Sequence, residues 1–99
     1  MNFMMGTEPA NGIPDLAAVK AALVEVLDLE ERADAIGPET RLVGALPEFD
    51  SLAVLELIVE LERRFAITIP DDEVTADAFE TLTSLTELVE RANRSDAVR

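Results

Sequence analysis

The residues best suited to chemistry in this chain are an aspartate and a serine, Asp50 and Ser51, which directly precede a long amphipathic segment. Both residue types are favoured as helix N-caps, because their side-chain oxygens accept hydrogen bonds from the free N–H groups of the first turn. A serine at a helix start is also well placed to carry a phosphodiester, since those N–H groups and the helix dipole favour an anion there. The pair therefore has two interpretations, a plain helix cap or a modification site.

The composition limits the chemistry that the chain can perform by itself. It has 21 acidic and 8 basic side chains, a formal net charge of −13, and neither Cys nor His. Thiolate catalysis, Cys/His zinc sites and histidine acid–base relays are therefore absent, and a serine without a basic neighbour cannot activate itself. An acidic chain repels nucleic acid and anionic membranes and is attracted to basic patches on proteins. We expect a non-enzymatic protein that binds no metal and no nucleic acid.

Length and hydropathy predict one small folded domain. The 99 residues are 48% hydrophobic and these residues fall in periodic blocks, which argues against disorder. No apolar run approaches membrane-spanning length, and the first residues lack the hydrophobic core of a signal peptide. We expect a cytoplasmic monomer that does not insert into membranes.

Helical periodicity predicts three longer helices and one short one. Apolar residues recur at steps of three or four in segments 14–31 and 51–65, and again in a last helix that Thr83 or Ser84 caps. A short third helix begins at Pro70. The fold class expected is all-α, a small antiparallel four-helix bundle.

The connections between these helices differ in length. The connection over 33–50 is long for a small domain and contains apolar residues, so we expect it to pack against the helices as it crosses. Residues 66–69 are too few for a paired strand and predict an extended linker. The helical domain is expected over 14–94, with flexible tails at 1–13 and 95–99.

The second long helix, over 51–65, is the most amphipathic segment of the chain. At 100° per residue, one broad arc predicts the core face and contains Val54, Leu55, Leu57, Ile58, Leu61 and Phe65. The opposite, solvent-facing side is predicted to contain Ala53, Glu56, Glu60, Arg63 and Arg64. Leu52 and Val59 lie on the border, where a partner protein can reach them.

Together these motifs resemble the acyl carrier proteins and their peptidyl-carrier relatives. The resemblance covers about residues 15 to 92 and rests on Asp50-Ser51-Leu52, Glu56-Leu57 and Ile67-Thr68-Ile69-Pro70-Asp71. It implies a helical bundle of the acyl-carrier type. In that family a serine is esterified with 4′-phosphopantetheine taken from coenzyme A, so the resemblance implies that Ser51 is the attachment site. The chain departs from the family's common Leu-Gly-x-Asp-Ser-Leu, with Pro47 in place of Gly and one added residue.

The resemblance also implies partners. A phosphopantetheinyl transferase would modify Ser51, an acyl-loading ligase would charge the arm, and acyl-processing or acyl-transferring enzymes would dock through basic patches. Asp50 is the candidate for orienting the site and pairing with a base on the transferase. The predicted partner-binding residues are Leu52, Glu56, Val59 and Glu60.

Two alternatives to an acyl carrier stay open at this point. The cargo, expected to be an acyl thioester of fatty acid, polyketide or specialised biosynthesis, could instead be an aminoacyl or peptidyl group. The chain could also be an unmodified acidic helical module that binds a basic partner through the same face.

Overall fold

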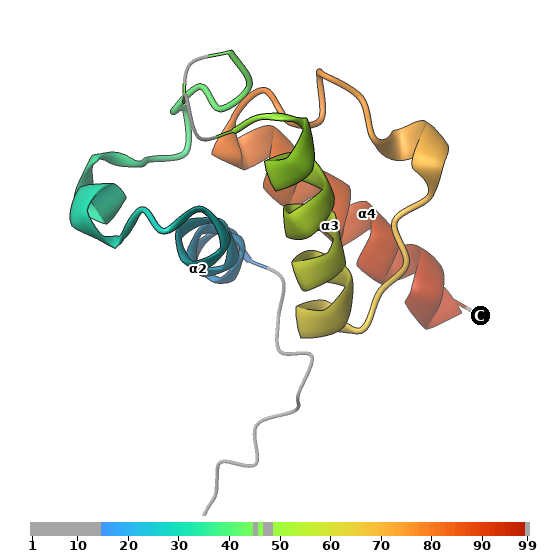
Figure 1. Cartoon of the computed structure of the whole chain (residues 1–99). Coiled ribbons are helices and arrows are strands. Elements are labelled where there is room, and N and C mark those ends of the chain that lie inside the picture. Colours follow the sequence, from blue (N-terminus) through green and yellow to red (C-terminus); the bar gives the residue numbers. More distant parts are fainter. Residues whose placement is uncertain (1–14, 45, 47–48, 99) are drawn as a thin grey trace, which may run out of the picture.

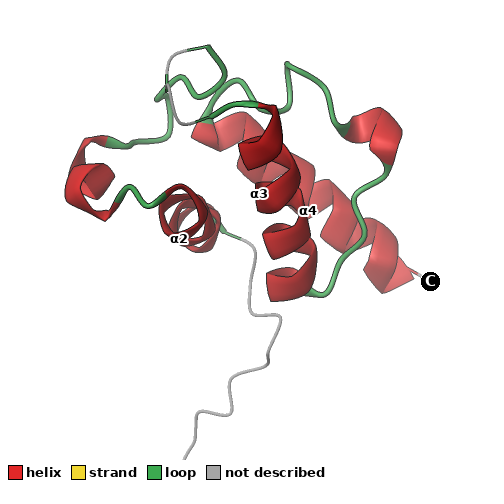
Figure 2. Cartoon of the chain, viewed as in Figure 1, coloured by secondary structure: helices red, strands yellow, loops and turns green. Residues whose placement is uncertain are grey.

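The computed structural model describes residues 15–44, 46 and 49–98, so the N-terminal tail predicted over 1–13 lies outside the described residues. The elements in order are α2 (Leu16–Leu27), the 3-10 turn η1 (Glu30–Ala35), α3 (Ser51–Phe65), the 3-10 turn η2 (Asp71–Glu73) and α4 (Leu82–Val98). Figures 1 and 2 show helices joined by loops, without a strand in the described part of the chain. The all-α prediction is confirmed.

The first long helix, α2, is shorter than predicted. Asp15 caps its start by accepting a hydrogen bond from the Ala18 N–H at 2.9 Å. The helix ends at Leu27 rather than near residue 31, because Asp28 adopts a left-handed conformation with φ 57°. The Leu29 N–H then bonds back to the Val24 carbonyl at 2.9 Å, which closes the helix and turns the buried Leu29 side chain inward. Asp28 is tolerated there because aspartate is one of the few residues that visits this region.

The core lies where the three long helices meet, and α2 packs against both α3 and α4. Its most deeply buried helical side chains are Val19 and Leu23 of α2, Leu57, Leu61 and Phe65 of α3, and Leu82, Leu85, Leu88 and Val89 of α4. The connection between η1 and α3 also contributes, since Leu42 is fully buried and Leu46 packs against the core. The prediction that this long connection packs as it crosses is therefore confirmed.

The core face of α3 is not the predicted one at its first turn. Ala53, placed on the solvent side by periodicity, is 5% exposed, whereas Leu55, placed in the core, is 62% exposed. The apolar arc of this helix is wider than the surface that α2 and its neighbours cover, so one edge must stay outside. The buried edge is the one with the small Ala53 side chain.

The segment after α3 behaves as an extended linker, as predicted. Ile67 and Ile69 alternate into the core. The Ile69 N–H donates to the Glu62 carboxylate at 2.8 Å, which ties the linker back to α3. The third helix that we expected to begin at Pro70 is only the three-residue 3-10 turn η2, with Pro70 as its N-cap.

The last helix, α4, begins and ends differently from the prediction. Its cap is Thr81, not Thr83 or Ser84: the Ser84 N–H donates to Thr81 Oγ1 at 3.1 Å, and the Thr81 N–H donates to Ser84 Oγ at 3.0 Å. This reciprocal pair is a capping box with serine at the third helical position. The helix continues to Val98, past the boundary expected at Arg94. None of the described helices combines the length and hydrophobicity that crossing a membrane requires.

Candidate functional site

Ser51 is the first residue of α3 and its side chain is exposed. Asp50 is the N-cap: its Oδ1 accepts a hydrogen bond from the Ala53 N–H at 2.9 Å. The Ser51 hydroxyl makes no hydrogen bond to any other described residue. The local sequence thus forms a capped helix start and presents a free hydroxyl at the positive end of a 15-residue helix.

The backbone that leads into this turn is anchored by an aromatic contact. Phe49 is buried, and its ring centroid lies 6.0 Å from that of Phe79, with the rings tilted by 34°. The Phe49 N–H also donates to the Leu46 carbonyl at 3.0 Å. This tilted packing of two buried rings fixes the residue two positions before Ser51. Sequence reasoning missed this contact, although an aromatic side chain directly before Asp50 was an available signal.

Backbone hydrogen bonds hold the preceding loop against the start of α4. The Leu42 N–H donates to the Glu80 carbonyl at 2.8 Å and the Val43 N–H to the Phe79 carbonyl at 3.3 Å. Arg41 and Thr81 form an isolated antiparallel bridge. In Figure 1 the described part of this green connection lies beside the segment that leads into α4. The loop that precedes the site is therefore tied to the helical body.

An apolar stripe runs along the exposed side of α3 from the Ser51 end. Leu52, Leu55 and Val59 are each more than 60% exposed, and Glu56 is exposed between them. We call these four residues the outer stripe. Three of the four predicted partner-binding residues, Leu52, Glu56 and Val59, lie together on it, and Leu55 joins them because the helix is rotated relative to the prediction.

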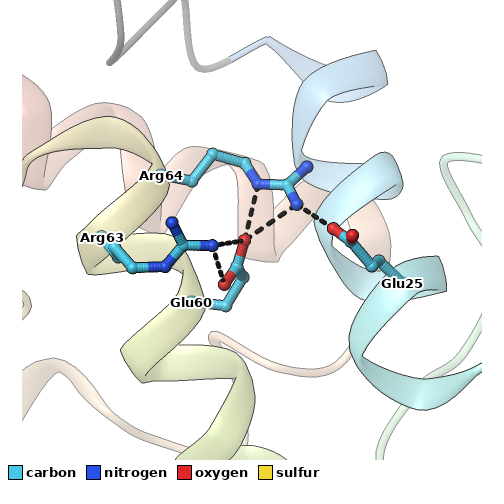
Figure 3. A network of polar contacts seen from close by, with 4 residues as sticks. All are labelled: Glu25, Glu60, Arg63 and Arg64. Atoms are coloured by element: carbon cyan, nitrogen blue, oxygen red, sulfur yellow. Dashed lines mark hydrogen bonds and ion pairs between the residues drawn. The ribbon is translucent and has the colours of Figure 1, made fainter.

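Glu60, the fourth predicted partner-binding residue, lies away from the outer stripe in a network of ion pairs (Figure 3). Its two carboxylate oxygens accept hydrogen bonds from Arg63 Nη2 at 2.7 and 2.9 Å, and one of them also accepts from Arg64 Nε at 2.9 Å. Arg64 reaches across to Glu25 on α2. The Arg63 hydrogen bond is the main cause that lowers the pKa of Glu60, and partial burial opposes it. The Glu60 carboxylate is therefore occupied within the molecule.

The helix start suits an added phosphodiester. The first N–H groups of a helix lack intrahelical acceptors, and only that of Ala53 is taken by the Asp50 side chain. A phosphate ester of Ser51 would lie at this positive end, where anions are favoured. Within the described ranges, no group of three or more carboxylates is arranged to hold a metal ion.

Comparisons with known proteins agree with this geometry. The family model described as a phosphopantetheine attachment site matches residues 17–91. An acyl carrier protein of Helicobacter hepaticus is 45% identical over 56 residues, which is 57% of this chain and 70% of the relative. A D-alanyl carrier protein of Streptococcus gordonii is 36% identical over 72 residues, or 70% of this chain and 87% of the relative.

A solved structure has the same fold. The solution NMR structure of a holo acyl carrier protein from Nitrosomonas europaea is 43% identical and superposes with a TM-score of 0.71, covering 77% of this chain and 92% of that one. The family model, the relatives and the shared fold thus show that this chain belongs to the acyl carrier protein family, the non-catalytic carriers whose prosthetic group is phosphopantetheine.

Proposed function

We propose that this protein carries acyl groups on a 4′-phosphopantetheine arm attached to Ser51. The observation that carries the proposal is the exposed Ser51 hydroxyl, free of hydrogen bonds to other described residues, at the capped start of α3. When bound, the group supplies a terminal thiol on a flexible arm, on which acyl groups are held as thioesters. The protein's own part is to present Ser51 on a rigid helix start.

The modification of Ser51 needs a partner enzyme. No basic side chain of the described residues bonds to Ser51, so a phosphopantetheinyl transferase must supply the base that activates the hydroxyl. Asp50 has a second carboxylate oxygen, Oδ2, that bonds to no other described residue. We assign this oxygen to pairing with a basic group of the transferase. The net charge of −13 attracts such partners over a distance.

The outer stripe is the docking surface that we assign to the transferase, an acyl-loading ligase and acyl-processing or acyl-transferring enzymes. Leu52, Leu55 and Val59 offer apolar contact, and Glu56 offers a charge to basic patches. Glu60 contributes through Arg63, whose guanidinium it holds in place.

An aminoacyl carrier is the second candidate. The D-alanyl carrier protein of Streptococcus gordonii aligns with a larger share of this chain than the acyl carrier protein of Helicobacter hepaticus, 70% against 57%. Fatty acid, polyketide and specialised pathways are all compatible with an acyl cargo. Charging assays with ATP separate the two: an acyl–carrier ligase with fatty acids should charge the modified protein, whereas charging only by a D-alanine ligase would favour the second candidate.

Intact-mass spectrometry tests the attachment site directly. The protein is incubated with coenzyme A, magnesium and a broad-specificity phosphopantetheinyl transferase, alongside Ser51→Ala and the control Ser95→Ala. We expect a single phosphopantetheine addition to the wild type and to Ser95→Ala, and none to Ser51→Ala. Addition to Ser51→Ala would place the site elsewhere. No addition to any folded variant, with several transferases, would favour an unmodified interaction module.

A further inference from the structure

The outer stripe of α3 ends at an arginine. Arg63 follows Val59 by four residues and Leu52 by eleven, so it lies on the same side of the helix. Its side chain is 72% exposed, the largest value in the network with Glu60, Arg64 and Glu25. The exposed side of α3 therefore carries Glu56 near the Ser51 end, apolar side chains along its length, and a positive charge at its far end.

The orientation of Arg63 is fixed from within the molecule. One nitrogen, Nη2, donates to both oxygens of Glu60, and Arg64 holds Glu60 from the other side while it contacts Glu25 on α2 (Figure 3). The other two nitrogens of the Arg63 guanidinium bond to no other described residue. The network holds the arginine in place and leaves donors for a partner.

The other acidic side chains near this end of α3 are occupied. Glu62 accepts the Ile69 N–H and is half-buried, and Glu60 is 15% exposed between two arginines. The two arginines offset the charges of Glu60 and Glu25. Although these four charges cancel and the chain has a net charge of −13, the most exposed charged group of this network is the Arg63 guanidinium, which lies at the end of the outer stripe.

We propose that Arg63 determines which enzymes dock on α3 and in which direction. This proposal rests on the carrier function proposed above. The partner it fits has an apolar groove for Leu52, Leu55 and Val59, a basic group opposite Glu56, and a carboxylate opposite Arg63. The two charged contacts are about 10 Å apart along the helix axis, seven residues at 1.5 Å each.

The physical reason is that opposite charges at the two ends of a stripe distinguish its two directions. An apolar groove alone accepts the helix in either direction, whereas reversed docking would bring like charges together at both ends. The favoured direction brings Ser51 to the entrance of the partner's active site. A docking face that is basic along its whole length would be disfavoured at Arg63.

A charge-exchange experiment tests this. The probe is a β-ketoacyl synthase chosen for a carrier-docking face lined with Lys and Arg from end to end. A second form of the enzyme has Glu in place of the basic residues farthest from its active-site entrance. Wild type, Arg63→Glu and Arg63→Gln are compared with Arg91→Glu, which makes the same charge change at an exposed position on α4. Loading of Ser51 and the fold of each variant are checked first, by mass and circular dichroism.

For the wild-type protein we expect kcat/KM to be about fivefold higher with the Glu-bearing enzyme than with the basic enzyme, because KM is lower. For Arg63→Glu we expect the opposite preference, by a similar factor. Arg63→Gln should show no preference, and Arg91→Glu should keep that of the wild type. Equal ratios for wild type and Arg63→Glu, or equal effects of Arg63→Glu and Arg91→Glu, would overturn the proposal. Calorimetry of the unmodified protein binding to each form of the enzyme gives the same comparison without loading. It therefore distinguishes a failure of this docking proposal from a failure of the proposed carrier function.

Discussion

The two longest helices, α3 and α4, are both amphipathic but use their apolar residues differently. Over residues 82–94, where the α4 side chains are described, Leu82, Leu85, Leu88 and Val89 are all buried. In α3, Leu57 and Leu61 are fully buried, yet Leu52, Leu55 and Val59 on the opposite side are exposed. Over these residues the large apolar side chains of α4 lie in the core, whereas α3 exposes three of its own to solvent.

We infer that this difference separates the residues that stabilise the fold from those that contact partner proteins. A contiguous row of exposed apolar residues on one helix is uncommon on a monomer and indicates a contact surface. The row begins beside Ser51, so the exposed apolar side chains and the proposed attachment site lie on the same element. We expect substitutions in α4 to act on folding and those on the outer stripe to act on partners.

The largest expected effect is a loss of stability when a buried side chain of α4 is truncated. Leu85→Ala, at a fully buried position of α4, should lower the free energy of unfolding by about 3 kcal/mol, since it leaves a cavity in the core. Urea denaturation followed by circular dichroism measures this. A loss as small as that of Leu55→Ala would contradict the assignment of α4 to the core.

The observed capping role of Asp50 and the transferase contact proposed for it can be separated by two substitutions. Asp50→Ala should cost about 1 kcal/mol of stability because the Ala53 N–H loses its acceptor. Asp50→Asn should preserve the cap and the stability but slow the loading of Ser51 severalfold, because it removes the charge assigned to the transferase.

The matched control for Asp50 is Asp15, which caps α2 with the same geometry. Asp15→Ala should lower stability to a similar extent, and Asp15→Asn should leave the loading rate unchanged. Equal loading by wild type and Asp50→Asn, measured by intact mass over time, would restrict Asp50 to its capping role.

The Glu60 network should make a small, pH-dependent contribution to stability. The pKa of the Glu60 carboxyl is lowered in the folded protein. Its contribution to the free energy of unfolding is therefore present above the ordinary glutamate pKa of about 4.3 and is lost as the pH falls through the lowered pKa. Glu60→Gln should be less stable than wild type at pH 7, and the gap should narrow at acidic pH. Thermal unfolding from pH 7 to pH 3 tests this, and a gap that is independent of pH would contradict it.

The smallest expected effect on stability is at the outer stripe. Leu55→Ala should change the free energy of unfolding by less than about 0.5 kcal/mol, because the side chain is already mostly in water. It should nevertheless raise the KM of an acyl-loading ligase for the modified protein. Glu87→Ala, at an exposed position of α4, is the control and should leave that KM unchanged.

Much of the helical organisation could be predicted from the sequence. Asp50 and Ser51 mark the start of α3 because capping depends on a side-chain oxygen and the next three residues. The helix ends were less predictable: α2 stops early because Asp28 turns left-handed, and α4 is capped by Thr81 through a reciprocal bond with Ser84. The free-energy difference between ending a helix at such a turn and continuing it is small. Contacts such as the burial of Leu29 in the core therefore decide where the helix ends.

The sequence by itself determined that Ser51 lies at a capped helix start in an all-α domain, because these features follow from local chemistry and periodicity. Only the tertiary structure decided which apolar edge of α3 is buried. Periodicity gives an arc of apolar residues, but the packing of α3 in the fold buries Ala53 and leaves Leu55 outside. It also decided that Arg64 pairs with Glu25, since this contact joins residues 39 positions apart in the chain.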